Sequence, residues 1–265
     1  MIIDSHEHIF QDINKQIELM DKGGIDKTIL FSTTIHPENA HNEIELENEM
    51  NKLTKILSGT LKGGERLEMQ KKSNEEVIEA VKSNPDRFMG FGAVPLDLTQ
   101  DEISEWIKRY IIDSNLLGTG EFTPGNLESV KNLEKVFKTL SDYPNYPMWI
   151  HTFHPVDVEK LKIIMNLCYK YPKVKVIFGH LGGANWQSVI EFAKNESQVY
   201  LDLSAVFSTL QIKSAAWQLP EKCLFSSDAP MGDPDIYRYM IEKTIKDKSV
   251  LEGVLGGNIQ RLLEL

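Results

Sequence analysis

Short apolar runs alternate with amphipathic stretches along the whole chain. The runs are rich in β-branched and aromatic residues and are short enough to be buried strands. The stretches between them carry apolar residues three or four positions apart, such as Ile103, Ile107 and Ile111, which is typical of helices. Strands that alternate with helices indicate a parallel sheet. The expected strands span residues 2–8, 27–34, 88–96, 116–122, 147–152, 174–180, 199–203 and 223–227.

The number of expected strands favours a closed barrel over an open sheet. Eight strand-like runs within 265 residues fit a (β/α)8 TIM barrel, which takes about 250 residues. No linker or internal repeat divides the chain, so we predict one α/β barrel domain over residues 1–265, closed by C-terminal helices. The expected helices span residues 11–21, 73–83, 99–111, 127–140, 156–169, 186–193, 210–217, 235–245 and 250–263.

The longest departure from the alternation lies at residues 35–72. This segment is rich in Glu, Asn and Lys, with helical spacing around residues 44–57, and it precedes a capping-box pattern of Ser73 and Glu76 that predicts a new helix. We interpret it as an insertion between the second strand and its helix. In a β/α barrel that connection lies on the face that carries the active site, so the insertion is a candidate lid.

Two histidines end the first apolar run. Side chains of a strand alternate between its two faces, so His6 and His8 should point the same way, with Asp4 below them. Such a pair at the end of a buried strand can hold one divalent metal ion. Alone it is weak evidence, because most histidines are surface or core residues.

Later strands deliver further metal-type side chains at the same end of the predicted barrel. Glu121, His151, His180 and Asp228 each lie at or just past the end of an apolar run. A single glutamate there usually faces solvent, and an aspartate before Ala-Pro is usually a turn residue. Their coincidence with His6 favours a metal site, because barrel strands converge at this end. Nitrogen and carboxylate donors suit Zn²⁺ first, and also Mn²⁺, Fe²⁺ or Co²⁺.

These motifs resemble the amidohydrolase superfamily, in its amidohydrolase-related branch of metal-dependent TIM-barrel hydrolases. The similar segments are Asp4-Ser5-His6-Glu7-His8, the strand-five histidine, Gly179-His180-Leu181-Gly182-Gly183, Ser226-Ser227-Asp228-Ala229-Pro230 and the closing Gly257-Asn258-Ile259-Gln260-Arg261-Leu262-Leu263. They occur in the family's order and cover residues 2–263. The resemblance is specific for fold and metal, and unspecific for substrate.

The resemblance implies roles for the matching positions. His6, His8 and His151 match metal ligands of the family. His180 matches a histidine that binds a second metal in some members and polarises the substrate in others. Asp228 matches the aspartate that contacts metal and shuttles a proton.

One position departs from many members of the family. They carry a carboxylated lysine on the fourth strand, where this chain has Glu121, as TatD-like nucleases do. Glu121 could bridge two ions, bind one, or only orient a histidine. The sequence therefore leaves open whether the site holds one ion or two.

The resemblance implies a metal-dependent hydrolase. A metal-bound hydroxide would attack the carbonyl carbon of a small amide, lactone or ester, with Asp228 as proton shuttle and His180 polarising the carbonyl oxygen. The first alternative is a metal-dependent nonoxidative decarboxylase of a small aromatic or unsaturated acid. A TatD-like nuclease and a noncatalytic metal-binding scaffold are weaker alternatives.

The composition of the chain limits the kinds of molecule that we expect it to bind. The formal net charge of −10 disfavours nucleic-acid binding. The two cysteines do not form a disulfide framework, and no signal peptide or membrane span is evident, which favours a cytoplasmic protein without membrane contact. We expect a small-molecule substrate, and a homo-oligomer remains open. Secondary candidates for substrate contact are His36, His41, Arg66, Lys71, Lys72, Trp149, His154 and Trp186, each of which could instead be a surface or packing residue.

Overall fold

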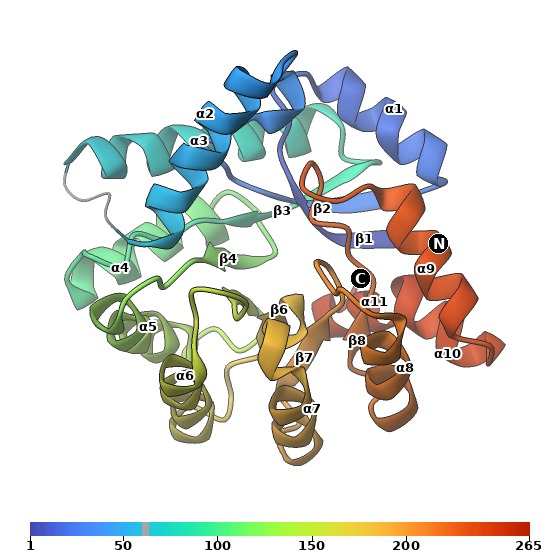
Figure 1. Ribbon diagram of the computed structural model, residues 1–265. Coiled ribbons are helices and arrows are strands. Elements are labelled where there is room, and N and C mark those ends of the chain that lie inside the picture. The colour runs from blue at the N-terminus through green and yellow to red at the C-terminus, as the bar shows by residue number, and fades with distance from the viewer. Residues whose placement is uncertain (60–63) are drawn as a thin grey trace.

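The strands form a single sheet that curls into a barrel, as the computed structural model shows (Figure 1). The structure describes residues 1–59 and 64–265, and the side chains of these except residues 64–66. All eight strands are parallel and lie in sequence order. The ring closes where the Ser5 amide donates to the Phe225 carbonyl at 2.9 Å. The strands are β1 Ile3–His8, β2 Lys27–Phe31, β3 Phe88–Gly92, β4 Gly118–Phe122, β5 Met148–His151, β6 Val176–Gly179, β7 Val199–Asp202 and β8 Cys223–Leu224.

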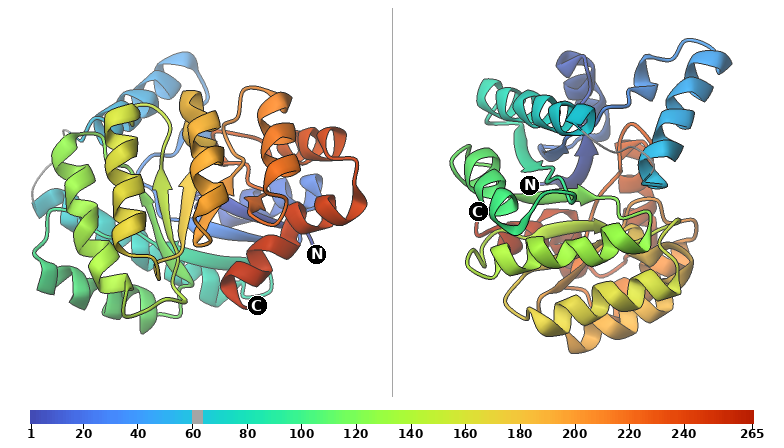
Figure 2. Two further views of the ribbon diagram at one scale, coloured as in Figure 1. Left: turned by 90° about the horizontal axis from the view of Figure 1, so that it is seen from below. Right: turned by 90° about the vertical axis from the view of Figure 1, so that its left-hand side faces the viewer.

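Helices surround the barrel and follow the strands in turn (Figures 1 and 2). Several begin at polar caps that the sequence provides, such as the Thr99–Glu102 capping box of α4 and Asp233 before Pro234 in α9. The helices are α1 Ile13–Gly23, α2 Glu43–Leu57, α3 Gly64–Ser83, α4 Gln100–Ile107, α5 Leu127–Leu140, α6 Val158–Lys170, α7 Trp186–Asn195, α8 Thr209–Gln218, α9 Pro234–Thr244, α10 Lys248–Glu252 and α11 Asn258–Leu263. A π-helical turn, Lys108–Ile112, extends α4, and another, Gly253–Gly257, joins α10 to α11.

The predicted TIM barrel is therefore confirmed, and its strand order follows from the alternation of apolar and amphipathic segments. Two apolar cores hold it together. One lies between the strands and the surrounding helices, and the other fills the barrel interior with Ile29, Phe31, Phe91, Trp149 and Ile177. Trp149 points into the barrel, as its position two residues before His151 predicts. The barrel is thus a packed core and not a pore.

The expected start of α3 at Ser73 is wrong. The helix already runs from Gly64, and the Ser73 hydroxyl donates within it to the Gln70 carbonyl at 3.2 Å. Residues 65–72 are Glu, Arg, Leu, Met, Gln and Lys, all good helix formers, so the helix continues through the position that resembles a cap. The insertion consequently consists of a 3-10 turn, Pro37–Asn39, then α2 and the first half of α3.

The α2 helix lies at one end of the barrel, apart from the ring of helices (Figure 2, right). Asn42 caps it by accepting a hydrogen bond from the Glu45 amide at 3.0 Å. None of its side chains is fully buried. Among the described residues, no helix is long and apolar enough to cross a membrane.

We predict that Phe91→Ala destabilises the barrel by about 3–5 kcal/mol in urea unfolding, because it leaves a cavity in the interior core. Phe91 is fully buried and its ring centroid lies 5.1 Å from that of Phe31. The matched control Phe207→Ala, at a side chain that is 69% exposed, should change the free energy of unfolding by less than about 0.5 kcal/mol. Equal effects of the two substitutions would contradict the packing described here.

Candidate active site

The histidines of β1 lie at the mouth of the barrel, and Asp4 holds the strand in place. His6 is fully buried and His8 is partly exposed. Pairing of β1 with β2 shifts register between Asp4 and Glu7. Asp4 is not among the residues whose side chains form the metal-ligand groups. Its Oδ1 accepts hydrogen bonds from the His6 and Ser227 amides, both at 3.1 Å, and so joins β1 to the segment after β8.

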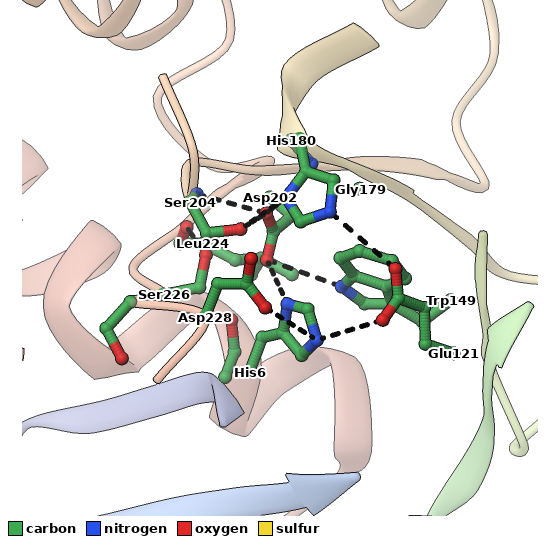
Figure 3. Close-up of polar contacts among 12 residues, drawn as sticks. His6, Glu121, Trp149, Gly179, His180, Asp202, Ser204, Leu224, Ser226 and Asp228 are labelled. Atoms are coloured by element: carbon green, nitrogen blue, oxygen red, sulfur yellow. Dashed lines mark hydrogen bonds and ion pairs between the residues drawn. The ribbon is translucent and has the colours of Figure 1, made fainter. Parts of the chain in front are cut away.

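Glu121, at the end of β4, lies between two sets of histidines. Its Oε2 atom is 3.3 Å from His8 Nε2 and 3.7 Å from His6 Nε2. Its Oε1 atom is 2.8 Å from His151 Nδ1 and 3.6 Å from His180 Nε2. One carboxylate therefore connects imidazoles from β1, β5 and the end of β6. Figure 3 shows its contacts with His6 and His180.

Asp228 faces the β1 histidines from the other side. Its Oδ1 atom lies 3.3 Å from His8 Nε2 and 3.7 Å from His6 Nε2. Its backbone amide donates to the His6 carbonyl at 2.8 Å, which ties the segment after β8 to β1. Asp228 and His180 adopt left-handed φ angles of 61° and 56°. Residues other than glycine adopt this conformation uncommonly, and such residues cluster at functional sites.

The charges of the cluster support one another. Burial disfavours ionised Glu121, but hydrogen bonds with the surrounding histidines outweigh burial and hold its pKa well below the usual range. Burial also opposes ionisation of Asp228, yet His6 and His8 lower its pKa. Conversely, burial disfavours protonated His8, but Asp228 and Glu121 raise its pKa to about 10. The two carboxylates thus attract positive charge to the position between them and His8.

Asp202 is a member of the site that the sequence interpretation missed. It ends β7, is fully buried, and its Oδ2 lies 3.9 Å from His6 Nδ1 (Figure 3). Its Oδ1 accepts hydrogen bonds from the His180 amide at 3.0 Å and the Ser204 hydroxyl at 2.5 Å. The Trp149 indole donates to Oδ2 at 3.3 Å. The sequence does contain a signal for it. Asp202 follows the apolar run of residues 199–201, so it lies at the same end of its strand as the other donors do of theirs.

Ser204 connects Asp202 to His180. The Ser204 Oγ atom lies 2.8 Å from His180 Nδ1, while its own proton is donated to Asp202. Since this hydroxyl donates to the carboxylate, it accepts from Nδ1, so Nε2 carries the lone pair of the neutral ring. Nε2 lies 3.2 Å from His151 Nδ1 and 3.6 Å from Glu121 Oε1. The Asp202–Ser204 pair therefore orients His180 and sets its tautomer.

His154 contributes its backbone and not its side chain. Its carbonyl oxygen lies 3.0 Å from His151 Nε2, whereas its exposed ring does not line the pocket. The carbonyl accepts the Nε2 proton of His151, so Nδ1 is the atom that faces Glu121 and His180. Nδ1 donates to the Glu121 carboxylate when the ring is protonated and offers a lone pair when the ring is neutral. The alternative role as a helix cap is filled by Asp157, which caps α6.

A cavity of about 220 Å³ opens onto these donors. Its inner end presents His8, Glu121, His151, His180 and Asp228. Side chains of the insertion cover the opposite end. The remaining lining residues are Ser32, Thr33, Thr34, Ile35, Leu53, Ile56, Leu57, Met69, Gln70, Ser73, Ala93, Thr123 and Met231.

The secondary candidates lie away from this cavity. The ring of His36 faces Glu38 at 3.0 Å, and His41 is exposed. Lys71 and Lys72 pair with Glu68 and Glu76 on the surface of α3. Trp186 packs against the outer core. The Arg66 side chain lies outside the described residues.

The structure brings the six predicted donors into one cluster. They fall into groups whose donor atoms lie within 4.8 Å of one another: His6 with His8 and Glu121, Glu121 with His151 and His180, and His6 with His180 and Asp202. Asp228 joins the first group through the contacts given above. This arrangement can hold a divalent cation, because each group offers nitrogen and carboxylate donors on converging strands.

Solved structures confirm the fold at low sequence identity. An uncharacterised TIM-barrel protein from Bordetella bronchiseptica is 18% identical, with a TM-score of 0.73 over 96% of this chain and 83% of that chain. The 5-carboxyvanillate decarboxylase from Sphingomonas paucimobilis is 15% identical, with a TM-score of 0.70 over 100% and 99%. A dihydroxybenzoic acid decarboxylase from Polaromonas sp., with bound manganese and the inhibitor 2-nitroresorcinol, is 18% identical, with a TM-score of 0.68 over 100% and 97%.

These likenesses establish the barrel and not the reaction, since all three identities are below 25%. No curated protein matches the sequence. The family model described as amidohydrolase matches residues 3–265, nearly the whole chain. The protein therefore belongs to the amidohydrolase family of TIM-barrel enzymes that this model defines.

Proposed function

We propose that the protein is a metal-dependent decarboxylase that removes CO₂ from a small aromatic or unsaturated carboxylic acid in the cytoplasm. The observation that carries the proposal is the donor cluster at the closed end of a small pocket with a largely apolar opposite wall. The decarboxylases of similar fold support this reaction over hydrolysis.

The residues present fit a divalent cation. Tetrahedral Zn²⁺ with bonds of about 2.0–2.2 Å places its ligand atoms about 3.3–3.6 Å from one another. His6 Nε2 and His8 Nε2 each lie 3.3–3.7 Å from the same two atoms, Glu121 Oε2 and Asp228 Oδ1. His6 Nε2 is buried and has no hydrogen-bond partner among the described residues, as expected of a donor reserved for an ion.

A second group could hold a further ion. Glu121 Oε1, His151 Nδ1 and His180 Nε2 face one another at 2.8–3.6 Å. Glu121 is the residue that both groups share, with Oε2 beside the β1 histidines and Oε1 beside His151. The proposed cation is Zn²⁺ or Mn²⁺, the latter because a decarboxylase of similar fold contains manganese.

The bound cation would supply positive charge that anchors and polarises the oxygens of the acid. The remaining chemistry falls to side chains. Loss of CO₂ breaks the bond between the carboxylate carbon and the ring, and the electron pair stays on the ring carbon. That carbon takes a proton, which Asp228, ionised at rest, would first accept from a water molecule and then deliver to the ring. The hydroxide left by the water combines with the released CO₂ as bicarbonate. His180, held by Ser204, would orient the acid by accepting a hydrogen bond from a ring hydroxyl at Nε2.

Hydrolysis of an amide, lactone or ester is the second candidate. The family description favours it, and Asp228 beside the β1 histidines could equally take a proton from water. The nuclease alternative is weaker, since no lysine or arginine is found among the described residues that line the pocket. A noncatalytic metal-binding scaffold is also weaker, because it would not need a proton-transferring residue such as Asp228 at the cavity.

We predict that Zn²⁺ or Mn²⁺ raises the melting temperature of the metal-free protein, since a ligand at a hundred times its Kd stabilises the folded state by about 2.7 kcal/mol. His6→Ala and Glu121→Ala should abolish the shift in differential scanning fluorimetry. The control His41→Ala replaces an exposed histidine and should retain it. An unchanged melting temperature in wild-type protein would refute the metal site.

We also expect Asp202→Asn to lower metal affinity by about 10- to 100-fold, because groups that orient ligating histidines have effects of this size. Isothermal titration with Zn²⁺ measures the affinity. Ser226→Ala is a nearby control, since Ser226 bonds to the Leu203 amide and not to a histidine. Asp202→Asn binding with wild-type affinity would show that Asp202 is only a packing residue.

Release of CO₂ tests the reaction itself. The metal-loaded protein should release CO₂ from a member of a panel of hydroxylated benzoates, and Asp228→Asn should reduce kcat by at least about 100-fold while the protein stays folded. Because Asp228 is also a proposed ligand, kcat is expressed per bound ion, with the metal content measured on the variant. Hydrolysis of lactones and anilides is assayed in parallel. Turnover of those substrates without CO₂ release would replace decarboxylation by the second candidate, and near-normal kcat in Asp228→Asn would remove Asp228 from proton transfer.

A further inference from the structure

We infer that the inner face of α2 is the wall against which the substrate packs, and that the site selects single-ring acids whose edge opposite the reacting carboxylate is uncharged. The inference takes one point from the proposed function, namely that the carboxylate of the acid is the group that reacts. The binding of the ring to the wall is a separate property of the pocket.

The inner face of α2 is an apolar stripe that faces the donor cluster across the cavity. Leu53, Ile56 and Leu57 lie at helical spacing and line the same cavity as Glu121 and Asp228. All three are only half-buried. Apolar surface left open to an enclosed cavity gains free energy when a ligand covers it, so an apolar ring is the occupant that this face fits.

The contacts at the end of α2 fix the depth of the pocket. Gly125 lies on the loop that follows β4, the strand that carries Glu121. A Cβ atom at Gly125 would lie 1.8 Å from the Leu57 carbonyl oxygen, so only glycine lets α2 come this close. Two residues later Gly59, with a φ of +67°, lies against the Asn126 side chain. The loop that follows the Glu121 strand therefore sets how closely the wall approaches the barrel.

The size and charge of the cavity limit what can occupy it. A volume of about 220 Å³ is below the range of about 300–1,000 Å³ for sites that take drug-sized ligands, which favours a single ring. Beside the α2 wall lie Met69 and Ser73 of α3, and the described lining contains no lysine or arginine. A second carboxylate on the ring would lose its water without gaining a cationic partner among the described lining residues.

Binding of three related acids to the zinc-loaded protein tests the inference. The probes are 2-hydroxybenzoate and its 4-methyl and 4-carboxy derivatives, titrated by calorimetry. We expect the 4-methyl acid to bind at least as tightly as the parent and the 4-carboxy acid to bind at least about tenfold more weakly. Equal binding of the methyl and carboxy derivatives, or no binding of any probe, would overturn the inference.

Variants of α2 locate the contact. Leu57→Ala and Ile56→Ala should each weaken binding of the 4-methyl acid by about fivefold or more, and Leu57→Lys should favour the 4-carboxy acid. The control Ile44→Ala lies on the same helix at a side chain that is 71% exposed and should change binding by less than about twofold. Metal content, measured on each variant, should not change. If Leu57→Ala and Ile56→Ala bind like Ile44→Ala, α2 is not the wall.

The same proteins separate this inference from the proposed reaction. If the rings bind with the expected dependence on Leu57 but no acid releases CO₂, decarboxylation is wrong and the wall stands. If CO₂ is released with the same KM in wild type and Leu57→Ala, the reaction stands and the wall is wrong. Gly125→Ala should raise KM more than it lowers kcat, because it displaces α2 and leaves Asp228 in place.

Discussion

The structure depends on one buried carboxylate that is shared by imidazoles from distant parts of the chain. Glu121 contacts His8 through one oxygen and His151 through the other. An ionised carboxylate in a protein interior costs several kcal/mol unless positive charge or hydrogen bonds compensate it. Here the compensating groups are histidines on different strands, and these strands come together only because the sheet closes. The cluster therefore depends on the closure of the barrel.

Two parts of the protein divide the demands of the site between them. The donors project from strands and from the first residues after them, where parallel pairing fixes their positions. The insertion has a different character, because α2 buries none of its side chains fully. A rigid frame thus holds the charged groups, while a lightly packed helix provides the apolar surface. Sites that combine a fixed reactive end with an adaptable outer wall can change specificity without rebuilding the chemistry.

Much of the fold and of the donor cluster could be predicted from the sequence, because apolar and polar residues repeat with the periods of strands and helices. Alternation along a strand places His6 and His8 on one face, and the convergence of strand ends brings Asp228 near them. Asp202 was overlooked because one acidic residue within a short apolar strand has no periodic partner. The start of α3 was misplaced because Ser73 and Glu76 match a capping pattern whose local preference is weaker than continued helix propagation. The register shift between Asp4 and Glu7 leaves no mark in composition.

The aromatic layer beneath the cluster has a consequence for the order of events. Phe31, Phe91 and Trp149 fill the barrel below His6, and the ring centroids of Trp149 and His6 are 4.2 Å apart. Among the described residues, these aromatic rings close the barrel below the cluster, and the cavity lined by α2 lies above it. An ion and an organic molecule that both enter through this cavity would have to do so in order, the ion first. Occupancy of the pocket by an acid would trap the ion behind it and slow its exchange with the surroundings.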